Sequence, residues 1–251
     1  MTTITAPEAT PDQTRQLSKL RRLNVIAGFA HLVQLILILA LANDFALPVT
    51  AAYMEGPPGT PSAAPVVLFE SRIAIGVAIF FALSALFHFL VASPLFYRRY
   101  AAGLVAQHNY FRWVEYSISS SVMIVLIAQI VGISDAAALI AIFGVNASMI
   151  LFGWLPFIFG CIAGIVPWLV VLLYVIAPGA KSAAEPPAFV YGIIISLFIF
   201  FNIFAIVQWL QYKRVGRWAN YLNGERTYIV LSLVAKSLLA WQIFAGTLAP
   251  S

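Results

Sequence analysis

Charged side chains are scarce in this chain. Only 9% of its 251 residues are Asp, Glu, Lys or Arg, whereas 62% are hydrophobic and the mean hydropathy is +0.95. Soluble globular domains carry about 25% charged residues, so this composition excludes a water-soluble domain. We therefore predict an all-α membrane protein that passes the cell membrane several times.

Cysteine is nearly absent as well. Cys161 stands alone, which excludes an intrachain disulfide and argues against redox chemistry. No metal-ligand spacing, nucleophile elbow or phosphate-binding loop occurs, so we expect neither a metal site nor an enzyme. The N-terminus also lacks the basic head and apolar core of a cleaved signal peptide. We expect residues 1–22 to form a short N-terminal tail.

Long apolar runs account for most of what is present. Seven of them approach the ~20 residues that a helix needs to cross a bilayer. They lie near residues 23–42, 67–92, 109–131, 136–153, 156–177, 188–211 and 227–248. The sequence therefore predicts a seven-helix transmembrane domain at residues 23–248. The connection at 43–65 is too rich in proline and glycine for a helix, and we expect an ordered cap, with a hairpin as one form.

The junction between the fourth and fifth predicted helices is unusual. No charged residue occurs between positions 136 and 177, and the only break is Phe152-Gly-Trp-Leu-Pro156. Gly153 suits the end of a helix and Pro156 suits the start of the next one. Two interpretations stay open: a very tight interfacial turn anchored by Trp154, or a polar loop that this sequence lacks.

The basic residues indicate the orientation of the bundle. If alternate connections lie on the same side, most cations share the side of the N-terminus, and the other side receives only Arg72 and Lys181. By the positive-inside rule, we expect a cytoplasmic N-terminus, an extracellular cap at 43–65 and, after seven spans, an extracellular C-terminus. The net charge of +5 then reflects membrane topology rather than a nucleic-acid surface.

One lysine and one carboxylate lie deep inside the predicted helices, whereas Asp44, Glu70, Asp135 and Glu225 lie at helix ends. Lys236 occupies the middle of the last helix, and Glu115 lies within the third. A charge at such a depth costs a few kcal/mol or more, so each of the two needs a partner. Both helices start on the same side, and at 1.5 Å per residue the two side chains differ in depth by only ~3 Å. They can therefore share one site.

Further polar side chains lie at the same level. Ser119 follows Glu115 by four residues and Ser232 precedes Lys236 by four, which places each hydroxyl on the same helix face as a charge. The first two helices contribute three more polar residues: His31, Ser84 and His88. Each of these residues alone is explained equally well by hydrogen bonding or close packing between helices. Only the combination of Lys236 with Glu115 indicates a functional site.

A lysine buried beside a single carboxylate suits one kind of chemistry. A desolvated amine is more readily neutral, and a neutral amine condenses with an aldehyde to form an imine. Once protonated, that imine is a cation inside the membrane and requires a nearby anion. Lys236 and Glu115 fit the attachment point and the counterion.

Three segments of the chain resemble the heliorhodopsins, microbial retinal proteins with an inverted membrane orientation. They are Phe111-Arg-Trp-Val-Glu-Tyr-Ser-Ile-Ser-Ser-Ser-Val-Met-Ile, Ile142-Phe-Gly-Val-Asn-Ala-Ser-Met-Ile-Leu-Phe-Gly-Trp and Val230-Leu-Ser-Leu-Val-Ala-Lys-Ser. The resemblance runs from about Leu23 to Thr247. It implies a rhodopsin-like bundle of seven helices and a cytoplasmic N-terminus, in agreement with the distribution of the cations.

The resemblance also implies roles for individual residues. Lys236 would bind all-trans retinal as a Schiff base, and Glu115 would be its counterion. Other side chains would surround this pair: Ser84, Ser119 and Ser232 as hydrogen-bond partners, and His31 and His88 in a hydrated cytoplasmic-side cavity. The weaker candidates for the retinal pocket, each explained equally by helix packing, are Asn146, Met149, Trp168 and Phe201.

Family members also form dimers through their fourth and fifth helices, so we expect a homodimer. Gly160 and Gly164 form a face of small residues on the fifth predicted helix, although such faces also occur inside bundles. The chain departs from the family pattern at 152–156, where relatives carry a polar cytoplasmic loop.

A light-driven proton pump requires a second acid on the third helix, beyond the counterion. Eleven residues after Glu115 this chain has Leu126, and Gln129 is the nearest polar side chain beyond it. A channel would require a continuous polar lining, which the outer halves of the later helices lack. Both observations disfavour ion transport.

We therefore predict a light sensor. Isomerisation of retinal would disturb the pairing with Glu115, move a proton transiently into the region of His31 and His88, and rearrange cytoplasmic loops that act on a signalling partner. Two alternatives stay open: a light-driven or light-gated proton or ion transporter that uses the histidines, and a membrane module by which light regulates a bound cytoplasmic enzyme.

Overall fold

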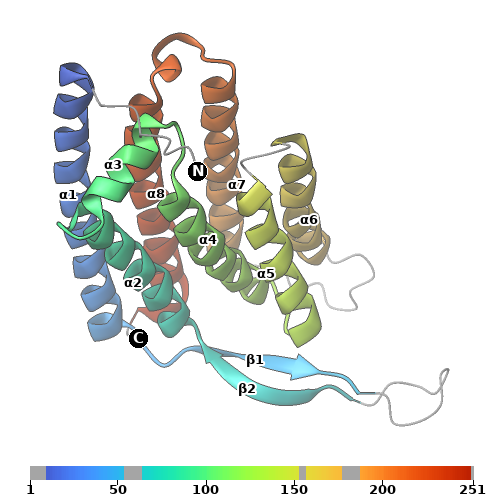
Figure 1. Cartoon of the computed structure of the whole chain (residues 1–251). Helices are drawn as coiled ribbons and strands as arrows, with labels where there is room; N and C mark the ends of the chain where they lie inside the picture. Colours follow the sequence, from blue (N-terminus) through green and yellow to red (C-terminus); the bar gives the residue numbers. More distant parts are fainter. Residues whose placement is uncertain (1–9, 54–63, 153–156, 177–186, 250–251) are drawn as a thin grey trace.

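The chain runs back and forth through a bundle of α-helices (Figure 1). The computed structural model describes residues 10–53, 64–152, 157–176 and 187–249. Within these ranges, the long helices are α1 (Pro11–Leu41), α2 (Ile73–Ala92), α4 (Tyr110–Ile130), α5 (Ala136–Leu151), α6 (Phe157–Ile176), α7 (Ala188–Tyr212) and α8 (Tyr221–Ile243). They confirm the predicted all-α bundle of seven long helices.

Shorter elements connect or extend these helices. They are strands β1 (Ala46–Ala51) and β2 (Val66–Arg72), helix α3 (Tyr97–Val105), the 3₁₀ turn η2 (Gly216–Ala219) and the π-helical turn η3 (Phe244–Leu248). In the described part of the chain, α1, α2, α4, α7 and α8 are long and apolar enough to cross a membrane, whereas α5 and residues 160–173 of α6 are shorter apolar helices. The chain is a multi-pass membrane protein.

Helix α1 begins earlier than predicted, within the segment that we expected to be a tail. Thr10 and Gln13 explain this start because they form a capping box, in which each side chain accepts a hydrogen bond from the other residue's backbone N–H. Pro11 occupies the first helical position, where its missing N–H costs nothing. Residues 11–22 are therefore helical, and residues 1–9 lie outside the described ranges.

Residues 66–72 form strand β2, which corrects the prediction of one helix over 67–92. Val66, Val67 and Phe69 favour strands because β-branched and aromatic side chains fit a pleated sheet. An apolar run by itself does not distinguish a strand from a buried helix. Strand β2 pairs antiparallel with β1, so the connection forms the hairpin that was one of its expected forms (Figure 1).

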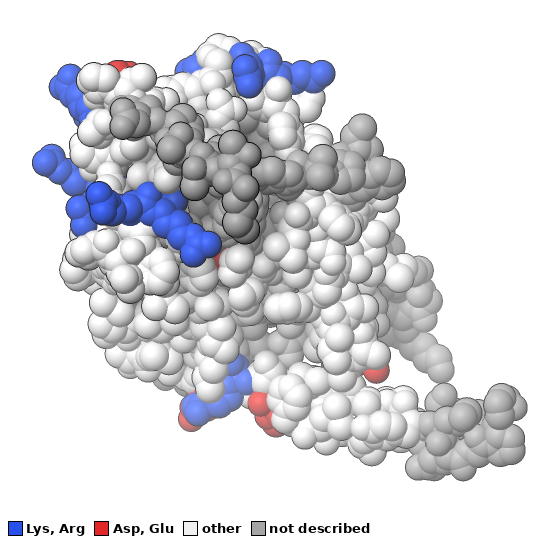
Figure 2. Space-filling model, in the orientation of Figure 1, with Lys and Arg blue, Asp and Glu red and all other residues white. Residues whose placement is uncertain are grey.

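The two ends of the bundle differ in charge. We call the end with the start of α1, helix α3 and turn η2 the basic end, because Lys and Arg gather there (Figure 2). Its exposed cations include Arg15, Lys19, Arg22, Arg98, Arg99, Lys213, Arg214 and Arg217. The opposite end carries the hairpin and the end of α8, and we call it the hairpin end (Figure 1).

Two groups of buried apolar side chains fill the bundle. The larger one includes Phe80, Ile124 and Leu239 and extends to the hairpin end. The smaller one lies at the basic end, where α1, α3 and α8 meet, and includes Leu104 and Ile229. The sequence-predicted polar residues fall between these two groups along α1, α2, α4 and α8. The fold therefore places the polar side chains at a boundary between two apolar layers.

The predicted break between the fourth and fifth spans lies outside the described residues. Helix α5 ends at Leu151 and helix α6 begins at Phe157, and residues 153–156, including Trp154, lie between the described ranges.

Candidate functional site

Lys236 and Glu115 form a buried ion pair between α8 and α4. The Lys236 Nζ atom lies 2.6 Å from Oε1 of Glu115, and the two residues are only 3% and 5% exposed. The same Nζ donates a hydrogen bond of 2.5 Å to Oγ of Ser84 on α2. The Ser84 hydroxyl in turn lies 2.9 Å from the same Glu115 oxygen. Three helices thus meet at one compact polar triad.

An apolar cavity of about 220 Å³ borders this triad. Helices α4 to α8 contribute to its walls, and Lys236 is part of its lining. Trp168 packs edge-on against Phe198 and Phe201, with ring centroids 5.3 and 5.5 Å apart, so the far wall is aromatic. Apolar walls around one amine fit an apolar ligand that reacts with that amine through an aldehyde, as retinal does.

The cavity brings together most of the predicted pocket residues. Its lining includes Ser119, Met149, Trp168, Phe201 and Ser232. The Ser119 hydroxyl is buried and has no hydrogen-bond partner among the described residues, which leaves it free for a group placed in the cavity.

Asn146 lies beside the cavity rather than in its lining. Its amide donates to the hydroxyls of Ser120, at 2.8 Å, and Ser121, at 3.1 Å, and so ties α5 to α4. Because Ser120 does line the cavity, Asn146 supports the wall from behind. The spacing of Asn146 and Met149 in the sequence did not distinguish their positions, because the two residues lie less than one turn apart on α5.

Gly160 and Gly164 face α5 within the same chain. A Cβ atom on Gly164 would collide with the side chain of Met149, and one on Gly160 would lie 3.4 Å from the Met149 carbonyl oxygen. Both glycines also line the cavity. The small-residue face therefore serves packing between α5 and α6 here, and the homodimer stays a prediction.

His31 and His88 lie next to each other on α1 and α2. Their rings stack with centroids 5.5 Å apart and an interplanar angle of 11°. Nδ1 of His88 lies 2.8 Å from the Asn24 side-chain oxygen. His31 is fully buried, and neither of its ring nitrogens has a hydrogen-bond partner in the described part of the chain. A neutral imidazole without a partner retains its capacity to accept one proton.

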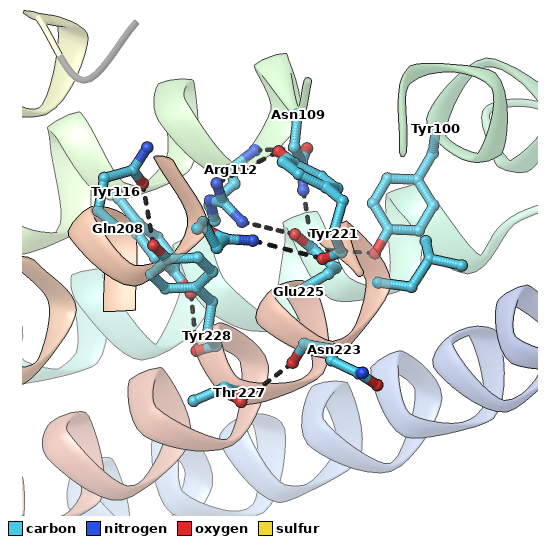
Figure 3. A network of polar contacts seen from close by, with 12 residues as sticks. Tyr100, Asn109, Arg112, Tyr116, Gln208, Tyr221, Asn223, Glu225, Thr227 and Tyr228 are labelled. Carbon is cyan, nitrogen blue, oxygen red and sulfur yellow. Dashed lines mark hydrogen bonds and ion pairs between the residues drawn. The ribbon is translucent and has the colours of Figure 1, made fainter. Parts of the chain in front are cut away.

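A second buried ion pair, which was not predicted from the sequence, joins α4 and α8. Arg112 Nη1 lies 2.6 Å from Oε2 of Glu225, and both side chains are nearly inaccessible. Asn109 donates to the other carboxylate oxygen at 2.7 Å, and Tyr100 donates to it at 3.0 Å (Figure 3). The Arg112 guanidinium also lies 4.0 Å from the ring centroid of Tyr228.

Glu225 was missed because the last helix was predicted to begin at residue 227. Helix α8 begins at Tyr221, where Asn220 caps it, so Glu225 lies within the helix. The spacing between Glu225 and Lys236 could have indicated that Glu225 is buried. Eleven residues separate Glu225 from Lys236, close to three full turns, so both residues lie on one helix face.

A chain of polar contacts connects the histidines with this second pair. The Asn24 amide lies 3.3 Å from the Tyr100 hydroxyl, and that hydroxyl donates to Glu225. Burial, together with the charge of Glu225, raises the pKa of Tyr100 well above its ordinary value. Tyr100 therefore keeps its proton and acts as a donor toward Glu225. His88, Asn24, Tyr100 and Glu225 form a continuous polar line toward the basic end.

Two crystal structures have a similar fold. Thermophilic rhodopsin aligns with a TM-score of 0.61 and 11% identity over 96% of both chains. The light-driven proton pump LR (Mac) from Leptosphaeria maculans aligns with a TM-score of 0.58 and 14% identity over 95% of both chains. At these identities the likeness shows a rhodopsin-like fold and nothing more, and a search of curated proteins finds no match.

The sequence pattern of one family covers most of the chain. The model of the heliorhodopsin family matches residues 20–248, which include α2 to α8 and all but the first turns of α1. The chain therefore belongs to the heliorhodopsin family and is a membrane-embedded retinal photoreceptor.

Proposed function

We propose that this protein is a light sensor in which Lys236 carries all-trans retinal as a Schiff base, Glu115 is the counterion, and signalling occurs without net ion transport. One observation carries the proposal: the Lys236 amine lines an apolar cavity and lies 2.6 Å from a buried carboxylate. Bound there, retinal supplies light absorption and photoisomerisation. Side chains of the protein stabilise the charge, orient the Lys236 nitrogen and accept the proton.

Glu115 and Ser84 hold the charge and the orientation of the Lys236 nitrogen. A buried cation without a partner is costly, so Glu115 stabilises the protonated form of that nitrogen. Ser84 accepts from Lys236 and can donate to Glu115, which fixes both groups from a third helix. The three contacts Lys236–Glu115, Lys236–Ser84 and Ser84–Glu115 share atoms, so a change in the direction of the Lys236 N–H bond disturbs all of them.

His31 and His88 are the groups that we assign to receive the displaced proton. The unpartnered nitrogens of His31 offer an acceptor, and the stacked ring of His88 links that acceptor to Asn24. The polar line from Asn24 ends at Glu225, which already accepts from Tyr100, Asn109 and Arg112. A proton placed on the histidines is therefore held inside the protein and returns to the Lys236 nitrogen.

The other half of the bundle offers no comparable route. Toward the hairpin end, Ile124, Leu126 and Ile127 of α4 are buried apolar side chains. Among the described residues, the buried polar side chain in that half of α4 is Gln129, whose Oε1 accepts from Ser71. The part of that half that the structure describes contains no buried acid to complete a relay across the membrane. This arrangement supports sensing rather than pumping.

The distribution of charge supports an orientation with the basic end in the cytoplasm. Exposed Lys and Arg concentrate at that end, as the positive-inside rule requires (Figure 2). The histidines then lie in the cytoplasmic half, and the loops near α3 and η2 are where a signalling partner would bind. Tagging either terminus and testing its accessibility in sealed cells measures this orientation directly.

Reconstitution with all-trans retinal tests the attachment site. We expect the purified protein to acquire a visible absorption band that hydroxylamine bleaches. Lys236→Ala should remain colourless although folded, whereas Lys213→Ala, which removes an exposed lysine after α7, should colour normally. A coloured Lys236→Ala protein that still bleaches with hydroxylamine would place the attachment elsewhere.

Light-induced pH changes in liposomes test the absence of transport. We expect no sustained pH change across the membrane, because the proton does not leave the protein. Time-resolved infrared spectra should show transient deprotonation of the Lys236 nitrogen. A steady light-driven pH gradient that a protonophore abolishes would favour the transporter instead.

A further inference from the structure

A groove on the outer surface of the bundle runs along α8, away from the site described above. It has a volume of about 540 Å³ and is bordered by the middle of α7, the first half of α8 and the turn η2. Its lining includes Phe200, Arg217, Arg226, Val230 and Val234. None of these residues belongs to the Lys236 cavity or to the Glu225 network.

The groove is cationic at one end and apolar along the rest. Arg226, Val230 and Val234 follow one another at intervals of four residues, so they lie on one face of α8. At 1.5 Å per residue this row is ~12 Å long and runs from the basic end into the membrane. Arg217 in η2 adds a second cation at the same end.

The two arginines are available to an anion. The ion pairs formed by described residues involve other cations, and none includes Arg217 or Arg226. Both side chains are exposed, and the Arg217 guanidinium lies over the ring of Trp218, 4.5 Å from its centroid. Guanidinium groups bind phosphate oxygens through paired N–H donors, and an interfacial tryptophan fits the level of lipid headgroups.

The apolar part of the groove faces the hydrocarbon of the membrane. Val230 and Val234 are each 45% exposed, and they lie on the side of α8 opposite the buried Lys236 and Ser232. An acyl chain fills such a surface without ordering polar groups, whereas water or a soluble ligand does not reach it. The groove therefore matches an amphipathic molecule with an anionic head and an apolar tail.

We propose that this groove binds an anionic phospholipid. Its headgroup phosphate contacts Arg217 and Arg226, and one acyl chain lies along Phe200, Val230 and Val234. The site requires a net negative headgroup, because two unpaired guanidiniums attract it and a zwitterionic lipid brings its own cation. Since α8 carries Glu225 and Lys236 on its inner face, the bound lipid holds the outer face of the helix that connects both buried ion pairs.

Native mass spectrometry of the full chain tests this site. The protein, in detergent micelles, is supplied with phosphatidylglycerol or with phosphatidylcholine of the same acyl chains, and retained lipid is counted. We expect preferential retention of phosphatidylglycerol, reduced roughly 30-fold in Arg217→Gln/Arg226→Gln, because each basic residue contributes about 1 kcal/mol to such binding. Val230→Trp, which fills the apolar part, should reduce retention of both lipids.

A matched variant controls for overall charge. Arg98→Gln/Arg99→Gln removes two exposed cations from α3 at the same end but outside the groove, and it should retain the lipid. Circular dichroism melting verifies that each variant is folded. Equal retention of the two lipids, an equal loss in the α3 variant, or an unchanged Arg217→Gln/Arg226→Gln protein would overturn the proposal. So would release of the lipid on dimerisation, which would assign the groove to a second copy.

Discussion

Arg112–Glu225 and Glu115–Lys236 connect the same two helices with the same N···O distance of 2.6 Å. Both pairs are almost fully buried. They differ in what surrounds them. Glu225 accepts hydrogen bonds from Arg112, Asn109 and Tyr100, so both of its oxygens have partners (Figure 3). Among the described residues, Ser84 is the further hydrogen-bond partner of the Lys236–Glu115 pair, the Tyr116 ring centroid lies 5.2 Å from Lys236 Nζ, and the pair borders a cavity.

The comparison indicates that Arg112–Glu225 is a structural ion pair, whereas Glu115–Lys236 can rearrange. A buried carboxylate whose oxygens are all occupied cannot gain from rearrangement, because every new contact requires the loss of an old one. Near Lys236, by contrast, the hydroxyl of Ser119 and both nitrogens of His31 have no partner among the described residues. The Lys236–Glu115 pair therefore lies near unpartnered polar atoms, whereas both carboxylate oxygens of Glu225 already accept hydrogen bonds.

Breaking the Arg112–Glu225 pair, in which both carboxylate oxygens have hydrogen-bond partners, should have the largest effect on stability. Arg112→Leu leaves Glu225 buried without its cation, and we expect a loss of about 3–5 kcal/mol in unfolding free energy. Thermal unfolding in detergent, followed by circular dichroism, measures it. Arg112→Gln/Glu225→Gln removes both charges and keeps hydrogen-bonding groups, so it should recover part of the loss. A fully stable Arg112→Leu protein would contradict the structural role.

Removing the negative charge of the Glu115–Lys236 pair should change the absorption spectrum more than the stability. In the proposed site, Glu115→Gln removes the anion beside the Schiff base cation at Lys236, so the absorption band of the retinal-bound protein should shift strongly to longer wavelength. Absorption spectroscopy measures the shift. Glu70→Gln, on the exposed strand β2, is the control and should leave the band in place. An unchanged band in Glu115→Gln would point to another counterion.

Removing the acceptor should change the kinetics without moving the ground-state band far. His31→Phe keeps the stacked arrangement but deletes both unpartnered nitrogens, so the deprotonated state should form at least ~10-fold more slowly or in lower yield. Flash photolysis follows this state directly. His108→Gln alters a histidine in the turn after α3, outside the cavity, and should behave as wild type. Identical kinetics in the His31 variant would assign the acceptor elsewhere.

The smallest effect should come from removing one of the hydrogen bonds that Glu225 accepts. Tyr100→Phe removes one hydrogen bond to Glu225 and leaves the other two, so we expect a loss of about 1.5 kcal/mol in unfolding free energy. Chemical or thermal unfolding in detergent detects a change of this size. The absorption band should not move, because Tyr100 does not line the cavity at Lys236. A strong spectral shift would show that the two ion pairs are coupled.

The pairing of Lys236 with Glu115 was predictable because depth along a helix follows from residue counting and because buried charges require partners. The cavity walls were less predictable. Asn146 and Met149 are near neighbours on α5, yet only Met149 lines the cavity, because the rotation of a helix about its axis depends on tertiary packing.

Helix boundaries were the main source of error. Strand β2 was included in a helix because an apolar run does not reveal its periodicity, and the buried Glu225 was placed at a helix end because α8 begins six residues before the predicted start at 227. Helix α3 was not predicted, since its nine residues are too few to give a clear pattern. The hydrogen bonds of Tyr100 therefore could not be anticipated.

The order of the charges along α4 and α8 restricts how these helices can move. From the basic end, α4 presents a cation and then an anion, while α8 presents an anion and then a cation. Sliding α8 along α4 in one direction brings Glu225 toward Glu115, and sliding it in the other brings Lys236 toward Arg112. Both displacements create like-charge repulsion in a medium of low polarity. The two pairs therefore oppose translation of α8 along α4 and fix the register between these helices.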